Sequence, residues 1–217
     1  MSKYGLVIFD WDGTLMDSTR DITRAIQAAS ADLGLPVPDE ARASWVIGLS
    51  LQQALEHAVP DLTQDDRQHF LDRYRAHYLA RDSELRLFDG VIEMLESLGQ
   101  RGVMLAVATG KSRVGLNRSL ESSGLGRFFA TTRCADETFS KPHPAMLHEI
   151  MDELGVQPES VVMVGDTSHD LNMAANANVH GLGVTYGAHP EDELRSHPHQ
   201  AIVSDPGALH QWLIQRT

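Results

Sequence analysis

The chain alternates short apolar segments with helical patterns, and this alternation constrains its fold more than any other feature. Each apolar segment is a few residues long and rich in β-branched residues, which is typical of strands buried on both faces. Helical patterns that begin near Ser112, Pro142 and Asp170 separate the later segments. This order predicts a parallel sheet with helices on both faces. The predicted strands are residues 6–9, 103–108, 129–132, 161–164, 181–185 and 201–203.

Between residues 18 and 82 the strand pattern stops and only helices are predicted. A first helix ends at Gly34, and Ser50 and Thr63 stand where their side chains can cap two further helices. Helices without strands, placed directly after the first strand, predict an inserted cap. The fold class is therefore α/β, a Rossmann-like doubly wound parallel sheet core with an inserted α-helical cap domain. We predict the core in residues 1–16 and 86–217 and the cap in residues 17–85.

Composition disfavours several classes of function. The chain has 18 Lys and Arg against 30 Asp and Glu, a formal net charge of −12, which disfavours nonspecific nucleic-acid binding. No apolar run approaches the ~20 residues that cross a bilayer, and the first strand starts too close to Met1 for a secretory leader. The single cysteine, Cys134, is expected to fill apolar space. We expect a cytoplasmic protein with no nucleic-acid or membrane partner.

The segment Asp10-Trp11-Asp12-Gly13-Thr14 directly follows the first predicted strand. Two carboxylates two residues apart can face one pocket where the chain turns, and Gly13 makes that turn easy. One carboxylate can then attack phosphorus, while the other donates a proton to the leaving oxygen and later takes one from water. Alone, the segment also fits a solvated acidic turn.

Two further segments offer groups that bind anions. Residues 109–112 (Thr-Gly-Lys-Ser) follow a predicted strand, and their hydroxyl, unhindered N–H and helix start can cradle an anion. Pro142 suits a first helical turn, which would put the Lys141 side chain at the positive end of a helix. Considered singly, the first segment also fits a helix cap, and Lys141 fits an ordinary surface lysine.

Two acids follow the strand at residues 161–164. Asp166 stands at its end and Asp170 a helical turn later, and carboxylate oxygens are ligands that Mg²⁺ prefers. Asp170 alone can equally cap the next helix. Each of the four segments falls where a predicted strand gives way to a loop or helix, and ligands of open α/β sheets bind at the carboxyl ends of the strands. Together the segments predict one active site.

In this order the four segments resemble the motif set of the haloacid dehalogenase-like hydrolases. DWDGTLMDS is similar to the first motif of the phosphatase branch, and GDTSHDLNMAANAN is similar to the fourth. The inserted helices match the cap of the phosphoglycolate phosphatase-like members. The resemblance implies a magnesium-dependent phosphatase that hydrolyses a small phosphomonoester, a phosphoglycolate-like metabolite, through an aspartyl-phosphate intermediate.

The resemblance also implies a role for each matching residue. Asp10 would be the nucleophile and Asp12 the general acid and base. Thr109 would bind the transferring phosphoryl group, with help from the N–H groups of Trp11 and Gly110. These roles make the first two segments the reacting half of the site.

The other two segments would supply positive charge. Asp10 and a phosphomonoester are both negative, so attack needs a cation nearby. Lys141 would offset charge on Asp10 and on the phosphoryl oxygens. The implied magnesium ligands are the Asp10 carboxylate, the Asp12 backbone carbonyl, Asp166, and Asp170 directly or through water.

Two departures from the family pattern concern the phosphate site and the hinge of the cap. Many relatives have Asn where this chain has Gly110, so a side-chain contact is missing, and Lys111 next to it either compensates or is solvated. Where relatives often place Pro before Gly, this chain has Phe88-Asp89-Gly90. The stiffness of the hinge is therefore left open by the sequence.

The cap is expected to supply the contacts to the substrate. The turn at residues 47–50, which ends at Ser50, is predicted to face the active site. Arg20 and Lys111 are candidates for binding a substrate carboxylate, with plain surface charge as the alternative. A group of histidines fits either a polar loop or an adventitious transition-metal site. Its members are His189, His197 and His199.

Asp12 separates functions on this fold, because dehalogenases need no general acid there and phosphatases do. A β-phosphoglucomutase-like phosphotransferase and an inorganic pyrophosphatase keep all four motifs and stay open as alternatives. From a different class, a noncatalytic phosphoryl-binding protein would be expected to have lost at least one motif residue. The expected partner is a small phosphorylated metabolite, with the chain acting as a monomer or homodimer.

Overall fold

The computed structural model describes residues 3–81 and 86–217. A six-stranded sheet lies at its centre, in the order β5-β4-β1-β6-β7-β8, and each neighbouring pair runs parallel. The chain fills one half of the sheet before it crosses to the other, so the predicted doubly wound α/β fold is confirmed. The strands are β1 Leu6–Phe9, β4 Met104–Thr109, β5 Thr131–Cys134, β6 Val161–Gly165, β7 His180–Val184 and β8 Ala201–Val203.

The predicted strands agree with these bounds to within one or two residues. The largest difference is at β5, predicted from residue 129, where Phe129 instead packs its ring edge-on against Trp11 before pairing begins at Thr131. Cys134 ends this strand fully buried, and burial raises the pKa of its thiol to about 12. The thiol is therefore protonated and fills apolar space, as expected.

Helices cover both faces of the sheet, and the central strand shows why. Side chains of a strand alternate between faces, so Val7 and Phe9 join one apolar cluster while Leu6 and Ile8 join the other. The first cluster includes residues of α5 Val91–Gln100, α6 Arg113–Ser123 and α10 Pro206–Ile214. The second includes residues of α7 Ala145–Leu154 and α8 Ser168–Asn176, and α9 Glu191–Arg195 lies near β8.

The residues between the first two strands of the sheet form a separate group of helices, here called the helical region (residues 19–79). It contains α1 Thr19–Asp32, α2 Glu40–Trp45, α3 Leu51–Ala58 and α4 Arg67–Leu79, packed around an apolar cluster of their own. A short antiparallel pair, β2 Met16–Asp17 and β3 Arg86–Leu87, stands at its base. The predicted division into core and cap stays a prediction, and its boundary at residue 85 lies outside the described residues.

Two predicted helix starts are wrong. The helix expected from Pro142 begins at Ala145, because Pro144 disfavours helical backbone at His143 before it. The helix expected to be capped by Thr63 begins at Arg67, because the Thr63 hydroxyl accepts from Asp66 N–H and holds a preceding turn. Caps at Ser50 and Ser112 are confirmed, since each hydroxyl accepts a backbone N–H three residues on.

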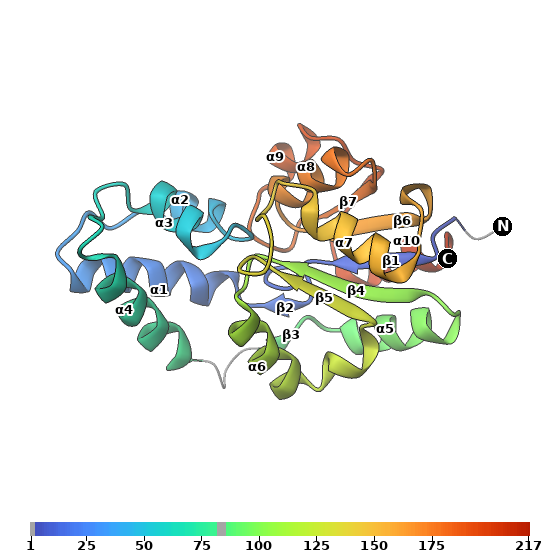
Figure 1. The fold of residues 1–217 in the computed structure, drawn as a ribbon, viewed down its shortest axis with the longest axis horizontal. Helices are drawn as coiled ribbons and strands as arrows, with labels where there is room; N and C mark the ends of the chain where they lie inside the picture. Colours follow the sequence, from blue (N-terminus) through green and yellow to red (C-terminus); the bar gives the residue numbers. More distant parts are fainter. Residues whose placement is uncertain (1–2, 82–85) are drawn as a thin grey trace.

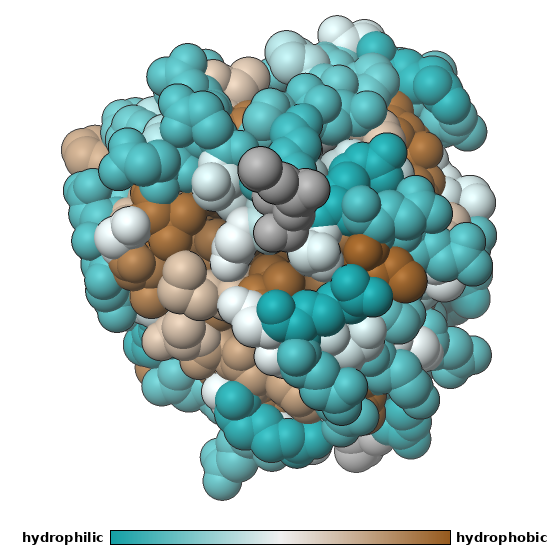
Figure 2. Space-filling model, turned by 90° about the vertical axis from the view of Figure 1, so that its right-hand side faces the viewer, coloured by the Kyte–Doolittle hydropathy of each residue, from teal (hydrophilic) through white to brown (hydrophobic). Residues whose placement is uncertain are grey.

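The helical region and the α/β core lie end to end, and the carboxyl ends of β1 and β4 point toward the helical region (Figure 1). Hydrophilic residues cover most of the opposite end of the molecule, with hydrophobic residues showing between them (Figure 2). Among the helices of the described residues, none combines the length and the hydropathy that crossing a bilayer requires. The junction between helical region and sheet edge is therefore where the predicted site must be sought.

Candidate active site

The carboxyl ends of the central strands bring the predicted residues together. Asp10 follows β1, which pairs with β4 on one side and β6 on the other. Thr109 ends β4 and Asp166 directly follows β6, and all three side chains are buried. The chain order reverses around β1, so this edge is a topological switch point, where ligands of open sheets bind.

Lys141 is fully buried and joins the first and fourth segments. Its Nζ lies 2.8 Å from Asp10 Oδ1 and 2.7 Å from Asp170 Oδ1. Burial alone would lower the pKa of this lysine, but the charges of Asp10 and Asp170 raise it above its ordinary value. Lys141 is therefore an ammonium held by two carboxylates rather than by a helix end, which corrects the sequence-based placement.

Three buried carboxylates form a group with the donor set of a hard cation. Oxygens of Asp10, Asp166 and Asp170 lie within 4.8 Å of one another, and two of these three acids, Asp10 and Asp170, contact the ammonium of Lys141. Burial raises the pKa of Asp10 to about 7 against the opposing charge of Lys141, and burial with the charges of Asp10 and Asp170 raises the pKa of Asp166. Asp10 Oδ2 is buried with no hydrogen-bond partner among the described residues. An all-oxygen site with excess negative charge fits Mg²⁺.

Neighbouring hydroxyl and backbone groups orient two of these acids. Thr14 Oγ1 donates to Asp166 Oδ1 at 2.9 Å, and Ala188 N–H donates to Asp166 Oδ2 at 2.7 Å. Thr167 Oγ1 donates to Asp170 Oδ2 at 2.7 Å within a capping box at the start of α8. Thr14 and Thr167 are not among the predicted site residues, although the Thr-x-x-Asp spacing at residues 167–170 is a capping-box signal.

Gly13 is required by the close approach of Asp166. Its φ is +81°, and a Cβ at this position would lie 2.1 Å from Asp166 Oδ2. A larger residue would therefore displace a carboxylate of the acid group. The predicted role of Gly13 in the turn after β1 agrees with this geometry.

Asp12 lies beside the acid group and has different partners. Its Oδ1 accepts from Ser18 Oγ at 2.6 Å and from Lys111 Nζ at 2.8 Å. Its carboxylate is not a member of the group formed by Asp10, Asp166 and Asp170. The two carboxylates of the first motif therefore have different surroundings: Asp10 has two further acids beside its lysine, and Asp12 has a lysine and a serine hydroxyl.

Two of the groups predicted to bind phosphate make hydrogen bonds within the protein. Trp11 N–H, predicted to bind phosphate, donates to Asp10 Oδ1 at 2.6 Å. Thr109 Oγ1 accepts from Lys111 N–H at 3.2 Å, at the point where β4 leads into α6. Gly110 lies directly under the turn at residues 47–50 of the helical region. The phosphate-binding roles of these residues stay predictions.

A pocket of about 850 Å³ opens between the sheet edge and the helical region. Asp10, Asp12 and Thr109 line one side of it, and Ser50 and the rest of the turn at residues 47–50 line the other. The turn therefore faces the acids as predicted. Arg20 is exposed and is not among the lining residues, as expected for a surface charge.

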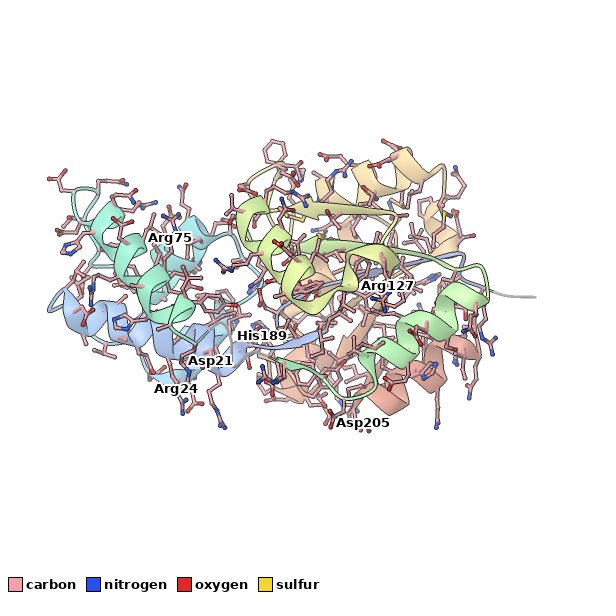
Figure 3. The ribbon with its side chains drawn as sticks, turned by 90° about the horizontal axis from the view of Figure 1, so that it is seen from below. Asp21, Arg24, Arg75, Arg127, His189 and Asp205 are labelled. Carbon is pink, nitrogen blue, oxygen red and sulfur yellow. The ribbon has the colours of Figure 1, made fainter. Side chains whose placement is uncertain are left out.

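Two histidines outside the predicted active-site residues join the core to the helical region. His169 Nε2 and His189 Nε2 each lie 2.9 Å from the backbone carbonyl of Trp45, at the end of α2, and His189 lies between the two parts of the molecule (Figure 3). Ser168 N–H donates to His189 Nδ1, so the proton of this ring is on Nε2. Burial lowers the pKa of both histidines, to about 4 for His169, so both are neutral donors.

Of the two interpretations of the histidine group, the structure favours polar contacts over a metal site. His189 pairs with Trp45, whereas His197 Nδ1 lies 2.9 Å from Asn172 Oδ1 and His199 Nδ1 lies 2.7 Å from the His197 carbonyl. Within residues 3–81 and 86–217, the acid group is the one set of three metal-ligating side chains that converges. The histidines are structural.

Gly110→Asn tests the fit of the turn on the sheet edge. A Cβ at Gly110 would lie 2.5 Å from the carbonyl oxygens of Gly48 and Leu49, so the turn must shift, at a cost of about 1–3 kcal/mol. We expect a lower melting temperature and a raised KM. Gly99→Ala is the matched control, because no heavy atom lies within 4 Å of its added Cβ. Unchanged KM and melting temperature in Gly110→Asn would contradict this account.

Comparison with known proteins places the chain in a family. The family model described as "Haloacid dehalogenase-like hydrolase" matches residues 7–184. Probable phosphatase IndB of Dickeya dadantii is 37% identical over 96% of this chain and 94% of that protein. A 5'-nucleotidase of Pseudomonas aeruginosa is 34% identical over 97% of this chain and 96% of that protein. A phosphoglycolate phosphatase of Agrobacterium fabrum is 30% identical over 97% of this chain and 93% of that protein.

A solved structure agrees with these relatives. The crystal structure of a predicted phosphatase from Clostridium acetobutylicum matches with a TM-score of 0.86 and 27% sequence identity, over 99% of this chain and 100% of that chain. The similarity extends through the helical region as well as the sheet. The resemblance noted in the sequence is confirmed: the chain belongs to the haloacid dehalogenase-like hydrolases and is an enzyme of their phosphatase branch.

Proposed function

We propose that this phosphatase is magnesium-dependent and hydrolyses a small phosphomonoester through an aspartyl-phosphate on Asp10. The observation that carries the proposal is the buried group of Asp10, Asp166 and Asp170, two of which contact the buried Lys141. The group combines a carboxylate at the end of β1 with a buried cation and an excess of acidic oxygens. A bound Mg²⁺, held by Asp10, Asp166, Asp170 and the Asp12 carbonyl, would neutralise these acids and the phosphoryl oxygens.

The first chemical step transfers the phosphoryl group to Asp10. An Asp10 oxygen attacks phosphorus, the new P–O bond forms as the ester P–O bond breaks, and the electron pair stays on the leaving oxygen. Asp12 gives its proton to that oxygen, so the product leaves as an alcohol. Lys141 offsets the negative charge that gathers on the nucleophile and on the phosphoryl group.

The second step returns the enzyme to its starting state. Asp12, now a carboxylate, takes a proton from water as the water oxygen attacks phosphorus. The bond between phosphorus and Asp10 breaks, and inorganic phosphate and free Asp10 are formed. Thr109, at the end of β4, is suited to bind the phosphoryl oxygens in both steps.

The substrate is proposed to be a small phosphorylated metabolite, with phosphoglycolate-like acids among the candidates. One relative is a phosphoglycolate phosphatase and another a 5'-nucleotidase. The pocket of about 850 Å³ is large enough for either class, and Lys111, Arg75 and Arg118 bring positive charge to its lining. We place the activity in the cytoplasm, with the chain a monomer or homodimer and without nucleic-acid or membrane partners.

The test is a screen of phosphate release over some eighty phosphorylated metabolites, with p-nitrophenyl phosphate as a general substrate. We expect Mg²⁺-dependent release from p-nitrophenyl phosphate and from a small set of metabolites. Activity that needs a sugar bisphosphate and releases little phosphate would favour the phosphotransferase instead. Preference for pyrophosphate would favour the pyrophosphatase. No turnover of any compound would contradict the proposed function.

Replacing Asp12 by Asn should slow turnover by roughly 10²–10⁴-fold, because the amide neither gives a proton to the leaving oxygen nor takes one from water. The measurement is kcat with p-nitrophenyl phosphate, together with the fraction of protein that carries covalent phosphate. That fraction should rise, since water activation fails after phosphoryl transfer. Asp17→Asn is the control, because Asp17 is an exposed acid of the same segment. Equal kcat values for the two variants would exclude Asp12 as general acid and base.

A further inference from the structure

Lys111 connects the proposed general acid to the helical region. Its Nζ lies 2.8 Å from Asp12 Oδ1 and 3.1 Å from the hydroxyl of Tyr78, a residue of α4. The same Nζ lies 5.1 Å from the centroid of the Tyr78 ring, within the range of a cation–π contact. Lys111 therefore links Tyr78 of the helical region to Asp12 of the first motif, although the two residues are far apart in sequence.

The contact is enclosed rather than a surface ion pair. The side chains of Lys111 and Asp12 are each 10% exposed. Burial alone would lower the pKa of Lys111, but the charge of Asp12 and the neighbouring Tyr78 raise it above its ordinary value. Lys111 is therefore a charged donor with fixed partners, which sets it apart from a solvated lysine.

The contacts leave one oxygen of Asp12 for proton transfer. Oδ1 accepts from both Ser18 Oγ and Lys111 Nζ, and two hydrogen bonds use the two lone pairs of a carboxylate oxygen. Oδ2 is then the oxygen that can carry the proton. Fixing Oδ1 on two sides fixes the direction of Oδ2 as well.

We propose that Lys111 and Tyr78 are positioning residues for the acid step of Asp12, so that proton transfer to the leaving group depends on α4 lying against the sheet edge. This role rests on the proposed function of Asp12. Neither residue exchanges a proton or forms a bond with the substrate. They act by holding the carboxyl group that donates the proton as the ester P–O bond breaks.

The positioning role predicts that the loss of kcat/KM in a variant depends on the leaving group of the substrate. Phenol is a weaker acid than p-nitrophenol, so phenolate needs the proton of Asp12 more than p-nitrophenolate does when the P–O bond breaks. Phenyl phosphate and p-nitrophenyl phosphate are similar in shape, which keeps binding differences small. Poor positioning of Asp12 should therefore lower kcat/KM for phenyl phosphate more than for p-nitrophenyl phosphate.

The first variant is Tyr78→Phe, which keeps the ring and removes the hydroxyl. Loss of one hydrogen bond predicts a roughly three- to tenfold fall in kcat/KM for phenyl phosphate, with a change of less than about twofold for p-nitrophenyl phosphate. Tyr74→Phe is the matched control, since Tyr74 stacks on Tyr78 from the same helix at a centroid distance of 6.0 Å. It should leave the ratio between the two substrates unchanged.

The second variant is Lys111→Met, which also allows a double-mutant cycle with Tyr78→Phe. It should lower kcat/KM for phenyl phosphate by roughly ten- to a hundredfold. If Tyr78 acts through Lys111, adding Tyr78→Phe to Lys111→Met should change the ratio no further. Wild-type ratios in both single variants, or fully multiplicative effects in the double variant, would overturn the positioning role alone. A wild type that hydrolyses neither substrate would overturn the proposed function, and this role with it.

Discussion

Asp10→Asn should abolish phosphate release from p-nitrophenyl phosphate, with kcat falling by roughly 10⁴-fold or more. The amide has nearly the shape of the carboxyl group but lacks the anionic oxygen that attacks phosphorus. Asp10 is buried and contacts Lys141, and its neighbour Trp11 donates to it through the backbone. These contacts identify the position as one where a small chemical change removes the nucleophile while the fold is kept.

The measurement combines steady-state rates with the mass of the intact protein after brief exposure to substrate. The wild type should show a transient gain of one phosphoryl group, Asp12→Asn a persistent gain, and Asp10→Asn none. Circular dichroism of the folded Asp10→Asn variant serves as the control for structure. Release at the wild-type rate from Asp10→Asn would remove Asp10 from the mechanism.

Chelation of divalent cations should silence the enzyme, and added Mg²⁺ should restore it. The carboxylates of Asp10, Asp166 and Asp170 outnumber the ammonium of Lys141, so a dication relieves their repulsion as well as serving catalysis. Binding should therefore also stabilise the fold, by about 2.7 kcal/mol when Mg²⁺ is at a hundred times its Kd. The readouts are phosphate release and melting temperature, each with EDTA and with excess Mg²⁺.

Asp166→Asn is the variant that separates the metal from general salt effects. Asp166 is fully buried and accepts from Thr14 and Ala188, so its amide can keep one of these contacts. The variant should lose most of the Mg²⁺-induced rise in melting temperature and most of its activity. Na⁺ at matched ionic strength should reproduce neither effect in the wild type. Full activity of the wild type in chelator would refute the magnesium assignment.

The sequence predicted the sheet and the acidic residues well, because both depend on local pattern. Alternation of Leu6, Val7, Ile8 and Phe9 between two apolar clusters follows from strand geometry alone. Asp10 and Asp166 could be placed at one edge because parallel strands end together. The helix start predicted at Pro142 is wrong, because Pro144 restricts the backbone of the residue before it and the helix begins only at Ala145.

Contacts between distant segments could not be predicted in the same way. Nothing near Lys111 in sequence indicates Tyr78, and nothing near His189 indicates the carbonyl of Trp45. Both contacts depend on how the helical region packs on the sheet, and that packing is set by many apolar residues at once. The requirement for glycine at position 110 could not be predicted either, because only the fold brings the Gly48 carbonyl close to Gly110.

The paired histidine contact to Trp45 has a consequence for how this enzyme can be altered. The acceptor is a main-chain oxygen, which every amino acid carries, while both donors belong to the α/β core. Substitutions at position 45 therefore replace the indole but keep the backbone carbonyl oxygen that accepts hydrogen bonds from His169 and His189. The helical region can thus diverge in sequence, by drift or by directed evolution toward new substrates, and still dock on an unchanged α/β core.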